Sequence, residues 1–315
     1  MYRSKTNHNK FNISFIIALS LLFSQVFAFI ANAEPVNQTD VVVNAEISET
    51  KPEVLAYEAN NVPNRIITTF NGDTQTQIGF NWYTTDKFDD AKVWVSESET
   101  LENAITFNAE AAEVISHYGE RDVNGFFIFA DVTVDENKNE TLNGYVTDEG
   151  KSGSKWMYNA EGKSQRLQIQ EVTEYSYKAL ATGLTLNTNY YYQVGSEAGE
   201  KSPIGQFTTS GESGEAFTFI HYTDTQNAFW NEHVRNEATF GADTLVRALE
   251  TVEDADFVLH TGDIVEIAEV EDEWVDLFTQ SEPSFLKLPV APVPGNHDEY
   301  GLVDLYPEKY NEHVN

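Results

Sequence analysis

The sequence has 315 residues, 41% of them hydrophobic, which suits a chain of about one to three globular domains. Its 51 acidic residues outnumber its 19 basic ones and give a formal net charge of −32. Such a negative surface repels the phosphate backbone of nucleic acids, so we expect no nucleic-acid-binding surface. The absence of cysteine from the sequence excludes disulfides, thiolate nucleophiles and thiolate metal sites.

The first 33 residues have the layout of a secretory signal peptide. Arg3, Lys5 and Lys10 precede an apolar run over residues 13–30, and Ala31-Asn32-Ala33 forms a small-residue cleavage site. The alternative is an uncleaved membrane anchor, because the apolar run approaches the length that spans a bilayer. We predict cleavage, and therefore a secreted protein, extracellular or associated with the cell wall, with no stable membrane span.

An acidic linker and then an all-β domain are predicted next. Residues 34–58 are polar and follow no hydrophobic period, which is typical of a flexible tether. Residues 59–210 have the pattern of an all-β domain. Strand-like runs over residues 66–70 and 76–82 meet at Asn71-Gly72, which is a strong hairpin signal.

Aromatic residues support a sandwich in this region. We interpret Trp82 and Trp94 as core anchors. The stretch over residues 184–194 resembles the tyrosine corner of fibronectin type III domains, in which a tyrosine hydroxyl bonds back to nearby backbone. Tyr190 is the matching position.

The stretch over residues 111–170 is longer than a plain seven-stranded sandwich needs. Within it, residues 119–162 are rich in Gly, Asn, Asp and Lys and include a strand-like run over residues 126–134. We predict a long hairpin excursion, with no role that the sequence indicates.

From residue 211 the pattern changes to alternating strands and helices. Strand-like runs cover residues 216–222, 257–260 and 288–293, which predicts parallel βαβ units. The first run is almost continuously apolar, which predicts a strand buried on both faces. Two helices are predicted between the strands, and their apolar faces are formed by Leu245, Ala248, Leu249 and Val252, and by Trp274, Leu277, Phe278 and Phe285.

Each of these three strands runs into polar side chains that can bind metal. The clusters are Thr223-Asp224-Thr225-Gln226, Gly262-Asp263-Ile264-Val265-Glu266 and Gly295-Asn296-His297-Asp298-Glu299. Because ligands collect at the carboxyl ends of parallel strands, we expect the three clusters to converge. Carboxylate, amide and imidazole donors suit Mn, Fe or Zn, and a pair of such ions about 3.5–4 Å apart can promote phosphate ester hydrolysis.

These clusters resemble the first three motif blocks of the calcineurin-like metallophosphoesterases. The preceding region, which closes on Tyr190-Tyr191-Tyr192-Gln193-Val194-Gly195-Ser196 and Phe207-Thr208-Thr209, resembles the N-terminal domain of the purple acid phosphatases. The resemblance implies a multi-domain fold. An all-β, fibronectin III-like sandwich over residues 59–210 would be followed, over residues 211–315, by the N-terminal half of an α/β metallophosphoesterase domain.

The same resemblance implies a site and a reaction. Asp224 and Gln226 would hold a first metal ion, Asp263 would bridge two ions, and Asn296 would hold the second. The two ions would be divalent or trivalent: Mn, Fe or Zn. His297 would polarise or protonate the leaving oxygen. The implied substrate is a phosphomonoester or phosphodiester.

Three departures from the family pattern bear on this expectation. Gln226 stands where many relatives have histidine, and Glu266 stands where the purple acid phosphatases have the tyrosine that colours Fe(III). The later histidines of the family, including a Gly-His-x-His block, do not occur in these 315 residues, so we expect a C-terminally truncated domain with little activity by itself. The alternative is a non-catalytic secreted binding module with a degenerate phosphoesterase domain, which bound metal would argue against.

Overall fold

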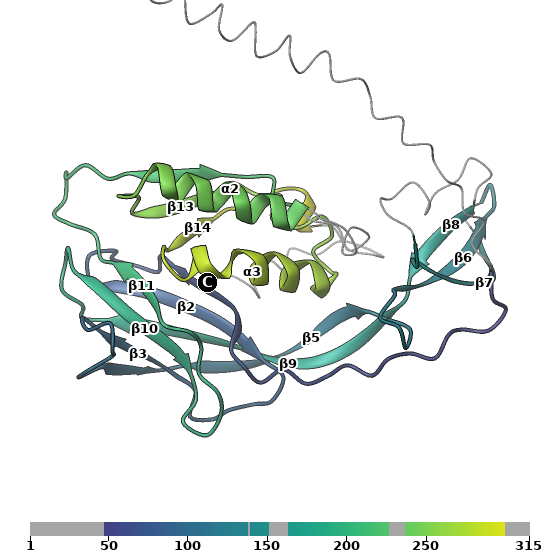
Figure 1. The fold of residues 1–315 in the computed structure, drawn as a ribbon, viewed down its shortest axis with the longest axis horizontal. Helices are drawn as coiled ribbons and strands as arrows, with labels where there is room; N and C mark the ends of the chain where they lie inside the picture. Colours follow the sequence, from purple (N-terminus) through teal and green to yellow (C-terminus); the bar gives the residue numbers. More distant parts are fainter. Residues whose placement is uncertain (1–46, 138, 151–162, 227–236, 300–315) are drawn as a thin grey trace, which may run out of the picture. The chain divides into compact units, whose positions relative to one another are not determined.

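The computed structural model describes residues 47–299 except for residues 138, 151–162 and 227–236 (Figure 1). All of these residues belong to one unit, residues 45–315. The predicted signal peptide and residues 34–46 of the predicted linker lie outside the described part. Within that part, no helix has the length and apolar character needed to cross a membrane.

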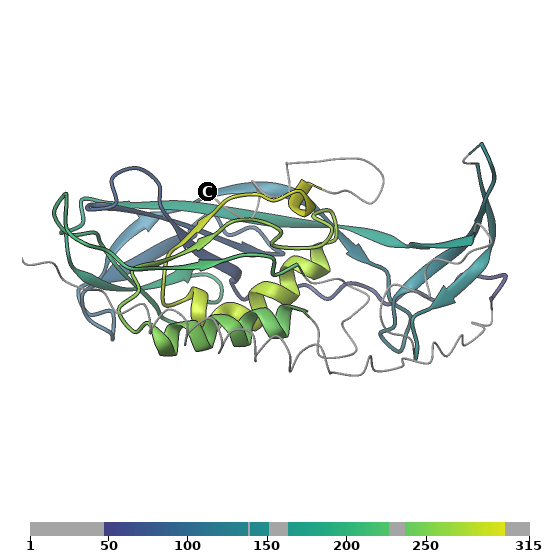
Figure 2. The same cartoon turned by 90° about the horizontal axis from the view of Figure 1, so that it is seen from above.

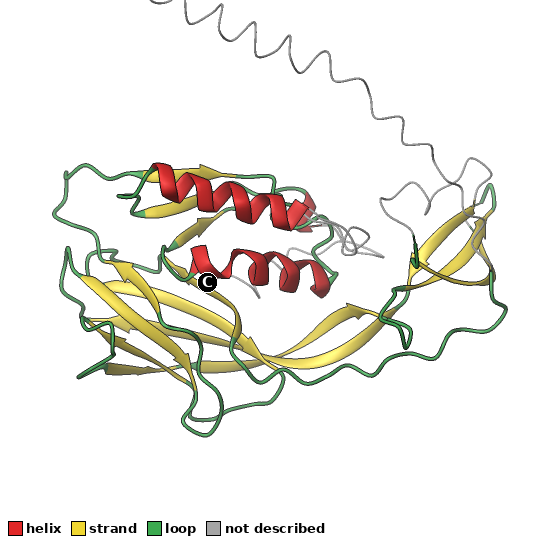
Figure 3. Ribbon diagram, viewed as in Figure 1, coloured by secondary structure: helices red, strands yellow, loops and turns green. Residues whose placement is uncertain are grey.

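Two four-stranded antiparallel sheets form a sandwich, as the β pattern predicts. One has the order β1-β2-β9-β5 and the other the order β11-β10-β3-β4 (Figures 1 and 3). The strands are β1 (Asn64–Thr69), β2 (Gln77–Thr84), β3 (Lys92–Ser96), β4 (Ile105–Asn108), β5 (Glu110–Gly119), β9 (Ile169–Thr182), β10 (Asn189–Gly195) and β11 (Gly205–Thr208). The predicted hairpin is confirmed, because β1 pairs with β2 across the turn at Asn71-Gly72.

Aromatic side chains fill the space between the sheets. Trp82 is 1% exposed and stacks on Tyr177, with ring centroids 5.4 Å apart. The hydroxyl of Tyr190 accepts a 2.9 Å hydrogen bond from the backbone N–H of Thr185, which confirms the tyrosine corner. The prediction for Trp94 is wrong: it is half-buried and lies beneath the ammonium of Lys201, 4.1 Å from the ring centroid. Strand alternation explains this, because its neighbours Val93 and Val95 take the inward positions.

The predicted excursion is a three-stranded antiparallel sheet rather than a hairpin. It consists of β6 (Ile128–Val134), β7 (Glu140–Thr147) and β8 (Lys163–Leu167), in the order β7-β6-β8. We call this sheet and the described residues of its connections (residues 120–137, 139–150 and 163–168) the insertion. It lies at the far end of the long β5–β9 pair (Figure 1).

A parallel sheet and two helices follow the sandwich. The strands β12 (Phe219–Tyr222), β13 (Phe257–His260) and β14 (Val290–Pro292) form a parallel sheet, and the helices are α2 (Glu237–Thr251) and α3 (Glu271–Phe285). Both helices lie on the same side of the strands (Figure 2). This confirms the βαβ pattern, but burial of β12 on both faces is wrong. Its residues alternate between exposed and buried, and Phe219 is 43% exposed, because the helices cover only the face of Ile220 and Tyr222.

The two regions share side chains across their contact. Ile67 of β1 belongs to the apolar cluster of the parallel sheet and its helices, while Leu286, just after α3, belongs to the sandwich core. The backbone N–H of Gln206 donates to the carbonyl of Leu286 at 2.7 Å. Helix α3 therefore packs directly on the sandwich.

Candidate active site

The three polar clusters come together at the carboxyl edge of the parallel sheet. Tyr222, His260 and Pro292 are in register, so the three loops leave the sheet at one level. The backbone N–H of Asp224 donates to the carbonyl of Gly262 at 3.1 Å. The N–H of His297 donates to Oδ1 of Asp263 at 3.0 Å. The predicted convergence of the clusters is thus observed for the loops themselves.

The backbone is unusual at the two aspartates expected to bind metal. Asp224 has φ 55° and Asp263 has φ 50°, both in the left-handed region that residues other than glycine rarely adopt. Gly295 allows this close packing, because a Cβ there would lie 2.2 Å from Oδ1 of Asp263. Sparsely populated backbone conformations concentrate at functional sites, where the surrounding structure holds them.

A buried histidine links the first two loops from below. The N–H of Gly262 donates to Nδ1 of His260 at 3.3 Å, so in the neutral ring the proton lies on Nε2. That nitrogen lies 3.0 Å from Oγ1 of Thr225, whose hydroxyl donates to the carbonyl of Ile264 at 3.0 Å. Burial lowers the pKa of His260 to about 4, against the opposing charge of Asp224. A neutral imidazole therefore completes this chain of hydrogen bonds at ordinary pH.

Asp298 links the second loop to the third. Its Oδ1 accepts hydrogen bonds from the N–H groups of Ile264 (2.8 Å) and Val265 (3.1 Å), and its Oδ2 accepts one from Gly295 (2.8 Å). The side chain is fully buried, and burial raises the pKa of its carboxyl group while these three N–H donors oppose the rise. Sequence reasoning assigned no role to Asp298 or Thr225. The only available signal was their place inside the motif blocks.

The predicted catalytic residue, His297, faces the second loop. Its Nδ1 lies 3.1 Å from the backbone carbonyl of Glu266 and 3.3 Å from Oε2 of the same residue. A ring nitrogen held by a neighbouring carbonyl and carboxylate fixes the tautomer and the orientation of an imidazole. Glu266 is therefore placed to orient His297.

The remaining donors suit metal binding by oxygen. Asp224 and Asn296 are exposed, Asp263 is half-buried, and Oε1 of Gln226 is buried with no hydrogen-bond partner among the described residues. A buried amide oxygen without a partner is costly, and a cation would satisfy it. No group of three or more His, Asp or Glu in the described ranges is placed to hold a metal ion. The expected set has only two such carboxylates, because its other two members are amides.

Comparison with known protein families gives two matches. Residues 63–209 match the family model for the purple acid phosphatase N-terminal domain, and residues 217–315 match that for calcineurin-like phosphoesterases. The chain therefore contains one segment similar to the purple acid phosphatase N-terminal domain and a following segment similar to calcineurin-like phosphoesterases. Among curated proteins, none matches the sequence.

A solved structure similar to this chain is that of purple acid phosphatase PPD1 from seeds of yellow lupin (Lupinus luteus). The sequences are 19% identical, and the TM-score is 0.47. The similarity covers 76% of this chain and 36% of the lupin chain. The match over residues 217–315 is to a family of hydrolases that use dinuclear metal centres.

Proposed function

We propose that the protein is a secreted phosphoesterase that hydrolyses phosphomonoesters or phosphodiesters at a dinuclear metal site. The observation that carries the proposal is the meeting of three strand-end loops at one sheet edge, with Asp224 and Asp263 both in the left-handed region. We further propose domain limits of 59–210 for the sandwich and 211–315 for the phosphoesterase segment. Secretion rests on the signal-peptide pattern of residues 1–33.

The proposed metal donors are the four residues that the sequence pattern indicates. Asp224 and Gln226 would hold one ion, Asn296 the other, and Asp263 both. Two observations support this set: Oε1 of Gln226 is buried with no hydrogen-bond partner in the described part of the chain, and Asp224 and Asn296 are exposed. When bound, Mn, Fe or Zn ions supply Lewis-acid stabilisation of charge on the phosphoryl oxygens.

The protein's own groups would orient the substrate and move a proton. With Nδ1 held by Glu266, the Nε2 atom of His297 is the proton donor that we propose for the leaving oxygen. Asp263 also accepts the N–H of His297, so the proposed bridging ligand and the proposed acid are held at a fixed spacing. This rigidity favours a preorganised site.

Metal content is the direct test. The protein and its Asp263→Asn and Asp254→Asn variants are dialysed against Mn²⁺, and bound metal is measured by mass spectrometry and titration calorimetry. Asp254 is the matched control, because it is an exposed carboxylate that lies before β13, at the amino edge of the sheet. We expect Mn²⁺ affinity to fall at least about 10-fold in Asp263→Asn, because mutation of a residue that only supports a metal ligand already lowers affinity by that much. We expect no change in Asp254→Asn.

Equal Mn²⁺ affinity in the two variants would refute the proposed site. Hydrolysis of p-nitrophenyl phosphate and of its bis-ester, assayed in the same samples, identifies the substrate class. Absence of stoichiometric Mn²⁺ binding in the unsubstituted protein would instead favour the non-catalytic binding module.

A further inference from the structure

Two buried carboxylates fix the loop that carries Glu266. The four successive N–H groups of residues 264–267 all donate to carboxylate oxygens. Asp298 accepts the first two at 2.8 and 3.1 Å, and Glu273 accepts the last two at 2.8 Å each. Both acids are fully buried. The conformation of the loop therefore depends on where Asp298 and Glu273 are held.

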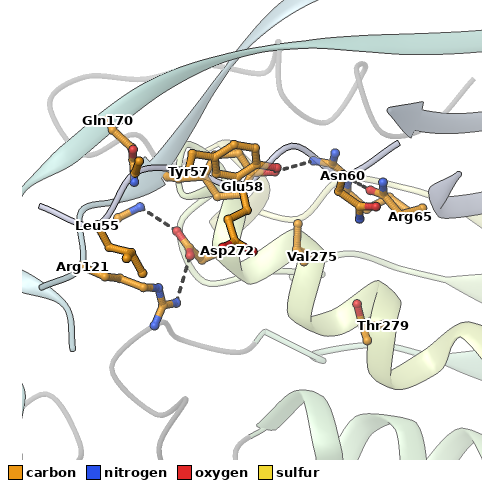
Figure 4. Close-up of a pocket in the computed structure, with 14 residues that line it drawn as sticks. Leu55, Tyr57, Glu58, Asn60, Arg65, Arg121, Gln170, Asp272, Val275 and Thr279 are labelled. Atoms are coloured by element: carbon orange, nitrogen blue, oxygen red, sulfur yellow. Dashed lines mark hydrogen bonds and ion pairs between the residues drawn. The ribbon is translucent and has the colours of Figure 1, made fainter. Parts of the chain in front are cut away.

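Glu273 lies in the first turn of α3, and this turn is bonded to the base of the insertion. Asp272 accepts a 2.7 Å hydrogen bond from the N–H of Gly119 and lies 3.1 Å from Nη2 of Arg121 (Figure 4). Just before the helix, Glu269 lies 3.1 Å from Nδ1 of His117 on β5. The helix start is thus tied to the end of β5 and to the residues that follow it.

The same loop enters the apolar core of the insertion. Val270 is fully buried there, and Ile267 packs at the edge of the same cluster. The other members come from the insertion and the start of β9: Phe127, Phe129, Val146, Leu167 and Ile169. The loop that begins beside Asp263 therefore ends inside the insertion.

A cavity of about 370 Å³ lies beside this contact. Its lining includes Tyr57, Arg65, Arg121 and Asp272 (Figure 4). Residues that line a cavity have no packing partners on that side. The attachment of α3 to the insertion therefore depends more on the hydrogen bonds of Asp272 and on the apolar contacts of Val270. The side chain of Arg121 also stacks on Phe127, with the guanidinium carbon 3.8 Å from the ring centroid, which joins the two contacts.

We propose that the insertion is a positioning element for the candidate active site, with Arg121 and Phe129 as its positioning residues. Through Asp272 and Val270 it holds the first turn of α3, through Glu273 it holds the N–H groups of residues 266 and 267, and so it fixes Glu266 against His297. Only the catalytic consequence of this proposal rests on the proposed function; the coupling of the insertion to the loop does not.

Hydrogen exchange of the loop tests the proposal without metal or substrate. We measure exchange of peptides that cover residues 264–267 in Phe129→Leu and in its control Phe207→Leu. Both phenylalanines are fully or almost fully buried, but Phe207 lies in the sandwich core. A second pair is Arg121→Met and Lys201→Met. Each cation stacks on an aromatic ring and pairs with an acid, Asp272 for Arg121 and Glu197 for Lys201.

We expect about 10-fold faster exchange at residues 264–267 in Phe129→Leu and Arg121→Met, and no acceleration in either control, because local opening follows the contacts that are removed. Urea midpoints measured in parallel separate this effect from a general loss of stability. Unchanged exchange in both insertion variants, or equal acceleration in their controls, would overturn the proposal. If Phe129→Leu does not fold, the partly exposed Arg121 decides the outcome. Absence of Mn²⁺ binding in the unsubstituted protein would refute the proposed function and leave the exchange result standing.

Discussion

The sandwich and the parallel sheet are held together in different ways. In the sandwich, two sheets cover each other's inner faces, and residues such as Phe80, Val93 and Tyr192 are fully buried. The parallel sheet has helices on one face, while Phe219 on the other is 43% exposed. Apolar packing between the two sheets thus supplies much of the stability of the sandwich. At the carboxyl edge of the parallel sheet, buried carboxylates and one buried imidazole join the loops instead.

This difference places the polar groups where the proposed chemistry needs them. An apolar core tolerates substitution by apolar residues of similar volume. By contrast, removing the partner of a buried charged group strongly destabilises the folded protein. Asp298, Glu273 and His260 therefore give the loops one defined arrangement. The sandwich contributes to this arrangement because it packs against α3, whose first turn carries three acidic residues.

The largest effect is expected at Arg65, a buried charged link between the two regions. Its guanidinium lies 2.7 Å from Oε1 of Glu174 on β9 and also pairs with Glu271 at the start of α3, and all three side chains are at most 2% exposed. Arg65→Met leaves two buried carboxylates without their cation, which costs about 3–5 kcal/mol of unfolding free energy. Urea denaturation at neutral pH measures this loss.

The control for Arg65 is an exposed ion pair of the insertion. Arg166 lies 2.6 Å from Oε1 of Glu140, with both side chains more than 40% exposed. Arg166→Met should therefore change the unfolding free energy by no more than about 1 kcal/mol. Limited proteolysis of Arg65→Met should cut the region of residues 217–299 before the sandwich. Equal losses for the two variants, or earlier cleavage of the sandwich, would contradict the comparison of the two regions.

A smaller effect, confined to acid, is expected from His260. Burial lowers the pKa of His260 from 6.5 to about 4, while Asp224 and Asp263 oppose this and His221 adds to it. Between these two pH values the unfolded chain binds a proton that the folded protein does not. Stability is therefore complete above about pH 6.5 and falls as the pH drops toward 4, by roughly 3 kcal/mol from this group.

His260→Gln removes this titration, so its unfolding free energy should change less with pH across that window than that of the unsubstituted protein. His221→Gln is the control, because it removes an exposed imidazole from the neighbouring strand, which contributes less than burial to the lowered pKa of His260. Denaturation curves at several values between pH 4 and 7 give the slopes. A slope that both variants flatten equally would show that burial of His260 is not its source.

The sequence predicted the elements and the loops better than the contacts between them. Periodicity located the strands and helices, and Gly-Asp and Gly-Asn-His at strand ends located the loop convergence. Trp94 was misjudged because a tryptophan with lysines above its ring has the same sequence pattern as a core tryptophan. Burial on both faces of β12 was wrong because an apolar run does not reveal which faces are covered.

The buried polar groups were not predictable for a related reason. Asp272, Glu273 and Arg65 look like solvated charges in a chain with 51 acidic residues. The partners of two of them lie far along the chain: Arg65 and Glu271 are 206 residues apart, and Arg121 and Asp272 are 151 apart. No local period marks such a pair, and only the packing of α3 on the sandwich brings it together.

The smallest expected effect concerns colour. We expect none, because the tyrosine nearest in sequence to the proposed metal ligands points into the helix-covered face of the parallel sheet. Glu266 stands at the position where the purple acid phosphatases have the tyrosine that binds and colours Fe(III). Tyr222, two residues before Asp224, is the other candidate, but its side chain is 7% exposed and meets the ring of His260 edge-on, with centroids 5.2 Å apart. Its hydroxyl lies next to α2, since a Cβ on Gly241 would be 2.7 Å from it. Tyr222 thus points into the helix-covered face, whereas Asp224 is exposed.

We expect the Fe(III)-loaded protein to show no strong absorption band in the middle of the visible range, and Glu266→Tyr to be the substitution that introduces one. A band that is already present in the unsubstituted protein and disappears in Tyr222→Phe would show that the buried face reaches the metal.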